Sequence, residues 1–105
     1  MTKCYVEQDG SRFLISCDGQ AGDVEACNFM TGIVYALAGY VHNAQTEDHA
    51  EIFAYETDKA RGRFLLHFTG DERTEAAFET AVIGLQMLER ERPACIHIDY
   101  GEENT

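Results

Sequence analysis

The residues best placed to do chemistry lie where a glycine-bounded turn, 19–22 (Gly-Gln-Ala-Gly), precedes an apolar segment that opens at Asn28. A turn of this kind passes a strand into a helix, and the N–H groups of a helix N-terminus can hold an anion or favour a thiolate. Two reactive side chains fall in this region, the thiol of Cys27 and the hydroxyl of Thr31. The chemistry they could support is nucleophilic catalysis, which also needs a general base.

A base for either nucleophile is hard to find. The four histidines are His42, His49, His67 and His97, and none lies in the turn. His42 falls about four helical turns from Cys27, on the order of 20 Å away at 1.5 Å per residue. The other three could approach only through tertiary folding. Because a free cysteine most often behaves as a small apolar residue, Cys27 is a fallback nucleophile without an identified partner.

A metal site is a weaker possibility. Cys95, His97 and Asp99 alternate along a predicted strand and therefore share one face, which His67 could join if its strand were adjacent. One strand rarely supplies a closed metal site. The glycines also lack the Gly-Lys-Ser/Thr ending of a phosphate-binding loop. We therefore expect no metal and no cofactor.

The elements that must position these residues follow from hydrophobic periodicity and turn signals. The pattern predicts strands at 3–7 and 12–17, a helix at 28–44, strands at 52–56 and 63–68, a helix from an N-cap at Thr74 to the region of Pro93, and a strand at 95–100. This order predicts an α+β fold, a two-layer ββαββαβ domain whose mostly antiparallel sheet has both helices packed on one face. Residues 1–100 form one domain, 101–105 an acidic tail, and 19–27 a mobile loop.

Both helices carry more apolar residues than one buried stripe requires, notably Tyr35, Tyr40, Ile83 and Met87. A surface helix of a monomer rarely exposes so many. We expect a homodimer that uses one or both helices.

The amino-acid composition limits the classes of partner that the protein is expected to bind. The chain of 105 residues has 19 acidic residues against 8 Lys and Arg, a net charge of −11. No basic cluster suits phosphate contacts, so direct nucleic-acid binding is disfavoured. No signal peptide and no apolar run of spanning length is apparent, so we expect no membrane association and a cytoplasmic location. The four cysteines form no CxxC pair, which favours free, mostly buried thiols.

The turn and the segment 28–37 (Asn-Phe-Met-Thr-Gly-Ile-Val-Tyr-Ala-Leu) together resemble a known family, the Prp ribosomal-processing cysteine proteases. That family has Gly-His-Ala-Gly after its second strand and Asp-Ile-Val-Cys-Ala-Ala-Val-Ser-Ala-Leu at the start of its first helix. The second half of the chain is similar too, at Phe78, 83–85, Leu88 and 93–96. The resemblance implies a His/Cys dyad that removes a short N-terminal extension from a ribosomal protein of the large subunit.

Both dyad positions differ in this chain. The family histidine corresponds to Gln20 and the family cysteine to Thr31, or to Gly32 if no gap is allowed. The family Asp and Ser correspond to Asn28 and Tyr35. An amide takes up no proton near neutral pH, so the resemblance implies a non-catalytic relative.

Such a relative would be a dimeric binding or regulatory module for a basic ribosomal protein or its N-terminal segment. The candidate groove residues are Gly19, Gln20, Ala21, Gly22, Asn28 and Thr31. The alternative is an active cysteine endopeptidase of the same type with its nucleophile relocated to Cys27.

Overall fold

The computed structural model describes residues 1–101, so residues 102–105 of the expected acidic tail lie outside the described part. Seven elements follow one another: β1 (Thr2–Asp9), β2 (Arg12–Asp18), α1 (Val24–Thr46), β3 (Ala50–Asp58), β4 (Arg63–Gly70), α2 (Glu72–Glu91) and β5 (Ile96–Tyr100). The predicted ββαββαβ order is confirmed.

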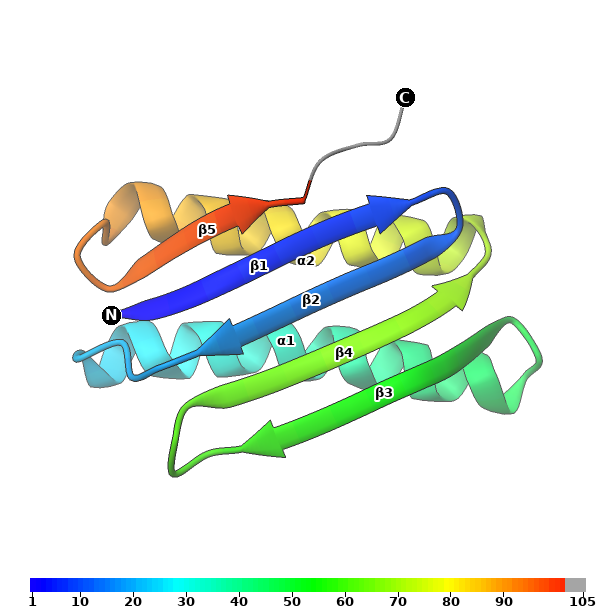
Figure 1. The fold of residues 1–105 in the computed structure, drawn as a ribbon, viewed down its shortest axis with the longest axis horizontal. Helices are drawn as coiled ribbons and strands as arrows, with labels where there is room; N and C mark the ends of the chain where they lie inside the picture. The colour runs from blue at the N-terminus through cyan, green and yellow to red at the C-terminus, as the bar shows by residue number, and fades with distance from the viewer. Residues whose placement is uncertain (102–105) are drawn as a thin grey trace.

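The five strands form one sheet in the order β3-β4-β2-β1-β5. β1 pairs antiparallel with β2, β2 with β4, and β3 with β4, whereas β5 joins β1 in parallel. Both helices lie behind the same face of the sheet, and no element within residues 1–101 covers the other face (Figure 1). The fold is therefore the predicted two-layer α+β architecture with a mostly antiparallel sheet.

The core lies between the sheet and the two helices. Alternate residues of β2 and β4, such as Phe13, Ile15, Leu66 and Phe68, are almost completely buried, as the period of two in a strand requires. The spacing of apolar residues predicts a core stripe of Phe29, Ile33, Leu37 and Val41 on the first helix, and this prediction is wrong at Phe29, which is 58% exposed. The buried positions of α1 are Ala26, Met30, Val34, Leu37, Ala38, Val41 and Ala44, a 3.6-residue pattern offset from Phe29.

The first helix begins four residues earlier than predicted. Asp23 is its N-cap, and the Asp23 side chain accepts a hydrogen bond from the backbone N–H of Glu25 at 3.0 Å. Aspartate is a strong capping residue, and with Asp23 as the cap the residues from Val24 to Cys27 enter the helix. The expected mobile loop is therefore shorter than 19–27, since residues 24–27 are helical.

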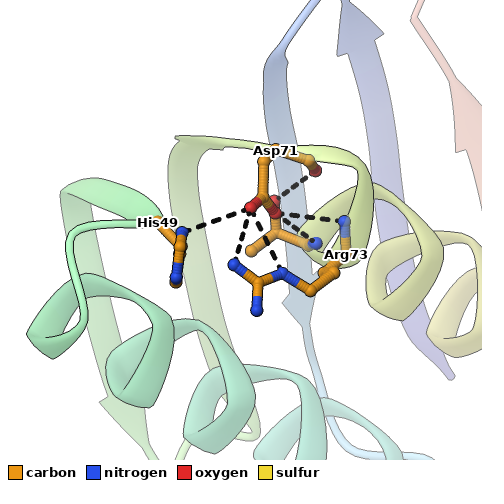
Figure 2. Close-up of polar contacts among 4 residues, drawn as sticks. His49, Asp71 and Arg73 are labelled. Atoms are coloured by element: carbon orange, nitrogen blue, oxygen red, sulfur yellow. Dashed lines mark hydrogen bonds and ion pairs between the residues drawn. The ribbon is translucent and has the colours of Figure 1, made fainter.

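The predicted N-cap of the second helix was also wrong. Asp71, not Thr74, caps α2, and its carboxylate accepts hydrogen bonds from the N–H groups of Arg73 and Thr74 at 3.0 and 3.2 Å (Figure 2). Thr74 is buried, and its hydroxyl donates to the Asp71 carbonyl at 2.8 Å. Aspartate and threonine are both common N-cap residues. Here the cap is Asp71, which directly precedes the first helical residue, Glu72.

Within residues 1–101, α1 is the one helix that is long and apolar enough, by length and composition, to cross a membrane. We expected no segment of this kind from the sequence. A helix that packs on a protein core meets the same criterion. α1 packs on the sheet through Met30, Leu37 and Val41.

Candidate functional site

Three segments that are far apart in the chain enclose a cleft of about 260 Å³ at one end of the sheet. One wall is the end of β2 and the turn after it, the second is the first half of α1, and the third is the connection between β3 and β4. Of the predicted site residues, Gly19, Cys27, Asn28 and Thr31 line this cleft. The fold thus brings the two candidate nucleophiles to one cavity.

Cys27 and Thr31 lie four residues apart on α1, so they occupy successive turns of one helix face. Because α1 begins at Val24, Cys27 is in the first helical turn and its N–H donates to the Asp23 carbonyl at 2.9 Å. Thr31 lies about 6 Å further along the helix, at 1.5 Å per residue. The favourable effect of a helix N-terminus on an anion therefore reaches Cys27 rather than Thr31.

An ion pair joins the N-terminus of α1 to the C-terminus of α2. The Arg92 guanidinium, at the C-terminus of α2, contacts the Asp23 carboxylate through Nη1 and lies 3.5 Å from a Glu25 carboxylate oxygen through Nη2. The negative charges stabilise the helix N-terminus, and Arg92 neutralises them in part. This contact holds the start of α1, and with it Cys27, against the end of α2.

Gln20 does not line the cleft, because its side chain reaches across to the β3–β4 connection. Its Nε2 donates to the Ala60 carbonyl oxygen at 2.8 Å. Beside it, the buried Thr2 hydroxyl donates to the Gly19 carbonyl at 2.8 Å. Ala21 is buried as well. The turn, which we expected to be mobile, is therefore fixed to β1 and to the β3–β4 connection.

Two glycines make this close approach possible. Gly19 and Gly62 both have positive φ values, 100° and 66°, a conformation that favours glycine. A Cβ at Gly62 would lie 2.5 Å from the Gly19 carbonyl oxygen, and a Cβ at Gly19 would lie 2.8 Å from the Met1 carbonyl oxygen. A larger residue at Gly62 would force the two turns apart, and one at Gly19 would collide with the backbone of Met1.

The inner part of the cleft is apolar and its rim is charged. Met30, Val34 and Phe64 are buried and contribute to the lining. At the rim, the Lys59 ammonium lies 5.4 Å from the centre of the Tyr35 ring, a cation–π contact. Tyr35, expected on an exposed helix face, is instead half-buried. Its ring packs edge-on against that of Phe64, with the ring centres 6.2 Å apart. The cleft can hold an apolar group under a polar rim.

No histidine lines the cleft, and residues 1–101 contain all four. His42 Nδ1 bonds the Ala38 carbonyl, and its ring packs against Tyr55. His49 lies 3.5 Å from the Asp71 carboxylate at the start of α2 (Figure 2). His67 packs against Phe53, and His97 pairs with Asp99 at 3.0 Å. None of the four is in place to act as a base for Cys27 or Thr31.

The possible metal cluster of Cys95, His97, Asp99 and His67 is not assembled. Cys95 precedes β5, so it does not share that strand with His97 and Asp99. His67 lies on β4, and β2 and β1 separate β4 from β5 in the sheet. Among the described residues, no group of three or more histidine, cysteine or acidic side chains could hold a metal ion.

Sequence reasoning missed the third wall of the cleft. In the sequence this wall is apparent only as a turn with basic residues, about 40 positions from Gln20. The wall residues are Asp58, Lys59, Gly62 and Arg63. The glycine at position 62 was the available signal, and a glycine does not indicate what its turn contacts. Thr2 gave no signal at all.

Solved structures of a ribosomal processing protease have the same fold. A crystal structure of Prp from S. aureus, described as an essential ribosomal processing protease in complex with a covalently linked product peptide, matches with a TM-score of 0.78. The sequences are 16% identical over 96% of this chain and 100% of that chain. At this identity the match shows that the two share a fold.

Further structures match at lower scores. Prp from S. aureus in complex with a substrate peptide has a TM-score of 0.68 and 15% identity, and it covers 96% of this chain and 100% of that one. SMU.848 from Streptococcus mutans has a TM-score of 0.65 and 17% identity over 95% of this chain and 93% of that one. The sequence matches no protein-family model and no curated protein.

Proposed function

We propose that this chain is a divergent, cytoplasmic relative of the Prp proteases that binds a peptide segment in the cleft without cleaving it. The observation that carries the proposal is the state of Gln20. This residue stands at the family histidine position in the sequence, and its amide is held by the Ala60 carbonyl at 2.8 Å. An amide in that bond neither accepts a proton from a nucleophile nor delivers one to a leaving group.

The nucleophile position supports the same conclusion. A threonine hydroxyl is a weak nucleophile unless an adjacent base removes its proton. No histidine within residues 1–101 lines the cleft that contains Thr31. The remaining titratable groups at the rim are Asp58, Lys59 and Arg63, together with Tyr35 and the two thiols.

The size and lining of the cleft favour a peptide side chain over a small cofactor. Its volume of about 260 Å³ lies below the roughly 300–1,000 Å³ of typical small-molecule sites. Buried Met30, Val34 and Phe64 would contact an apolar side chain, and the polar groups of Asn28 and Thr31 are available to the peptide backbone. The two Prp structures described above carry a product peptide and a substrate peptide.

The partner we propose is a basic protein, with the N-terminal segment of a ribosomal protein as the first candidate. The chain's net charge of −11 would attract a basic partner over a distance and raise the rate of association at low salt. The rim of the cleft itself carries both signs of charge, so we expect charge to govern association and the apolar floor to govern affinity.

A second candidate function is proteolysis with Cys27 as nucleophile. Its support is that Cys27 lines the cleft and lies in the first turn of α1. Against it stands the absence of a histidine from the cleft.

The test uses a fluorescently labelled peptide with the sequence of the family's ribosomal N-terminal extension. Anisotropy reports binding, and mass spectrometry of the same mixture reports cleavage. We expect saturable binding to the native protein and no cleavage. Cleavage that disappears in Cys27→Ser would replace the non-catalytic proposal by the second candidate, and no binding at all would contradict both.

A matched pair of variants locates the binding site. The chain has no tryptophan, so Thr31→Trp fills the cleft and also provides a fluorescence signal for folding. Asn43→Trp, on an exposed position of the same helix, is the control. Binding should be lost in the first variant and kept in the second.

We also propose that the protein is a homodimer that uses the outer faces of the helices. Small residues, Gly32, Ala36, Ala77, Ala81 and Gly84, line a groove of about 670 Å³ between α1 and α2. Phe29 and Tyr40 lie at the same groove, and Ile83 and Met87 of α2 are also about half exposed. Small residues permit close approach of a second copy, whose large side chains can fill the groove.

A further inference from the structure

Two thiols face each other inside the core, next to the cleft. Cys4 on β1 and Cys17 on β2 are directly opposite in the antiparallel register, and both side chains point to the helix-covered face. Their sulfur atoms are 2.9 Å apart. Directly opposed residues of an antiparallel pair have Cα atoms about 4.5–5.5 Å apart, which lies within the range of about 4.4–6.8 Å that a disulfide spans. A bond between these sulfurs therefore needs little backbone movement.

The two thiols differ in access. Cys17 lines the cleft, whereas Cys4 lies behind it, paired on its other side with Ile98 of β5. A small oxidant that enters the cleft meets Cys17 first. Each cysteine is less than 5% exposed, so a bulky reagent would not reach the pair as easily as a molecule the size of water.

They also differ in chemistry. The Cys4 S–H donates a hydrogen bond to the sulfur of Cys17, the cysteine that lines the cleft. This hydrogen bond, together with burial, raises the pKa of the Cys4 thiol. Cys4 is therefore held as the protonated partner, and Cys17 is the sulfur positioned to react first.

We infer that Cys4 and Cys17 form a peroxide-reactive dithiol, in which Cys17 is oxidised through the cleft and Cys4 closes the disulfide. In the first step the Cys17 thiolate attacks one oxygen of hydrogen peroxide. A sulfur–oxygen bond forms, the oxygen–oxygen bond breaks, and the departing hydroxide takes a proton to become water.

In the second step the Cys4 sulfur attacks the Cys17 sulfenic acid. A sulfur–sulfur bond forms and the sulfur–oxygen bond breaks, while the proton of Cys4 leaves with the hydroxide as a second water. Two thiols lose two electrons in total, and one peroxide is reduced to two waters. A dithiol reagent reverses the change. This inference does not depend on the proposed peptide binding.

The oxidation also changes the cleft. The sulfurs must approach from 2.9 Å to the bonded distance of about 2.05 Å, which draws the Cys17 side chain toward Cys4. The disulfide would also fix β1 to β2 immediately before the turn that carries Gly19 and Gln20.

The experiment treats the intact protein with hydrogen peroxide and counts thiols by mass spectrometry without reduction. The central variant is Cys27→Ser/Cys95→Ser, because it keeps both thiols of the buried pair and removes the other two. We expect this variant to lose two hydrogen atoms per chain, to remain uncrosslinked on a non-reducing gel, and to regain both thiols with dithiothreitol. In the native protein, tandem mass spectrometry should place the link between Cys4 and Cys17.

Single variants assign the roles. Cys4→Ala should stop at a sulfenic acid on Cys17 that dimedone traps, and Cys17→Ala should leave Cys4 unreacted at the same peroxide exposure. Circular dichroism checks that both fold, and if either does not, the Cys27→Ser/Cys95→Ser result decides alone. A link from Cys17 to Cys27, or two intact thiols in Cys27→Ser/Cys95→Ser while Cys27 or Cys95 of the native protein oxidises, would overturn the inference.

Discussion

The Gln20 side-chain amide donates to the Ala60 carbonyl across 2.8 Å, and this bond joins two turns that are 40 residues apart in the chain. It holds the turn after β2 against the β3–β4 connection, and both of these segments contribute residues to the cleft. Replacing Gln20 by Leu removes the donor, and we expect a fall of about 0.5–1.5 kcal/mol in the free energy of unfolding, near the lower value because the bond is exposed. Urea denaturation measures the change.

The matched variant for this bond is Gln20→Glu, which keeps the length of the side chain but offers only acceptors to the Ala60 carbonyl. It should be at least as destabilised as Gln20→Leu. If both variants unfold at the same urea concentration as the native protein, the bond contributes nothing to stability. The two turns are then held by the glycine contact alone.

Gly62→Ala and Gly10→Ala separate two effects of an added methyl group. Both glycines have φ near 60°, but a Cβ at Gly10 meets no atom within 4 Å, whereas one at Gly62 lies 2.5 Å from the Gly19 carbonyl oxygen. A left-handed alanine costs roughly 1–2 kcal/mol. We expect Gly10→Ala to lose about that much and Gly62→Ala to lose clearly more, with weaker peptide binding. Equal losses would show that the turns move apart freely.

Restoring the family dyad tests the proposal that Gln20 and Thr31 leave the chain without catalytic activity. Thr31 is two turns inside α1, beyond the reach of the helix N-terminus, so a thiol placed there should keep a pKa near 8.5. In a Cys27→Ser background, Thr31→Cys alone should therefore react slowly with iodoacetamide at pH 7. Adding Gln20→His should raise the rate, by about tenfold for each unit by which the imidazole lowers the pKa. Identical rates in the two variants would show that position 20 cannot reach position 31.

Asp71 should make stability depend on acid pH. Burial alone would raise the pKa of its carboxyl, but the N–H of Thr74 and the guanidinium and N–H of Arg73 outweigh burial and hold the pKa below the usual 3.8 (Figure 2). A carboxyl with a lowered folded pKa contributes stability above its unfolded pKa, and the contribution is lost as pH falls through the folded pKa. Asp71→Asn should therefore lose less stability than the native protein between pH 5 and pH 3.

The control for this acid effect is Glu79→Gln, which removes one carboxylate from an exposed position of the same helix. Urea unfolding at both pH values provides the comparison. If Asp71→Asn and the native protein lose the same stability on acidification, the hydrogen bonds to Asp71 do not favour its charged form.

The proposed dimer predicts a mass of twice 11.8 kDa at micromolar concentration. Ile83, 57% exposed on the outer face of α2, should lie in the contact, so Ile83→Lys should give a monomer. Asn43→Lys adds the same charge to an exposed position of α1 away from the groove and should leave the dimer intact. Sedimentation analysis measures the masses, and a monomeric native protein would refute the proposal.

Local patterns determined most of the fold. Alternation along β2 and β4 and the turn signals between strands predicted the strands, because period two and turn chemistry act within a few residues. Helix starts were less certain, since Asp23 and Asp71 compete with nearby residues that also cap helices. The composition of the turn 19–22 and the identities of Gln20 and Thr31 were sufficient to suggest both the family resemblance and the loss of its dyad.

The tertiary structure alone decided what surrounds those residues. The hairpin register places Cys4 opposite Cys17, but only packing turns both sulfurs inward to 2.9 Å beside a cleft. Likewise, no local signal connects Gln20 to Ala60, because the bond depends on where two distant turns meet. Sequence periodicity reports which face of an element is buried. The partner of a given side chain is decided by contacts between elements that are far apart in the chain.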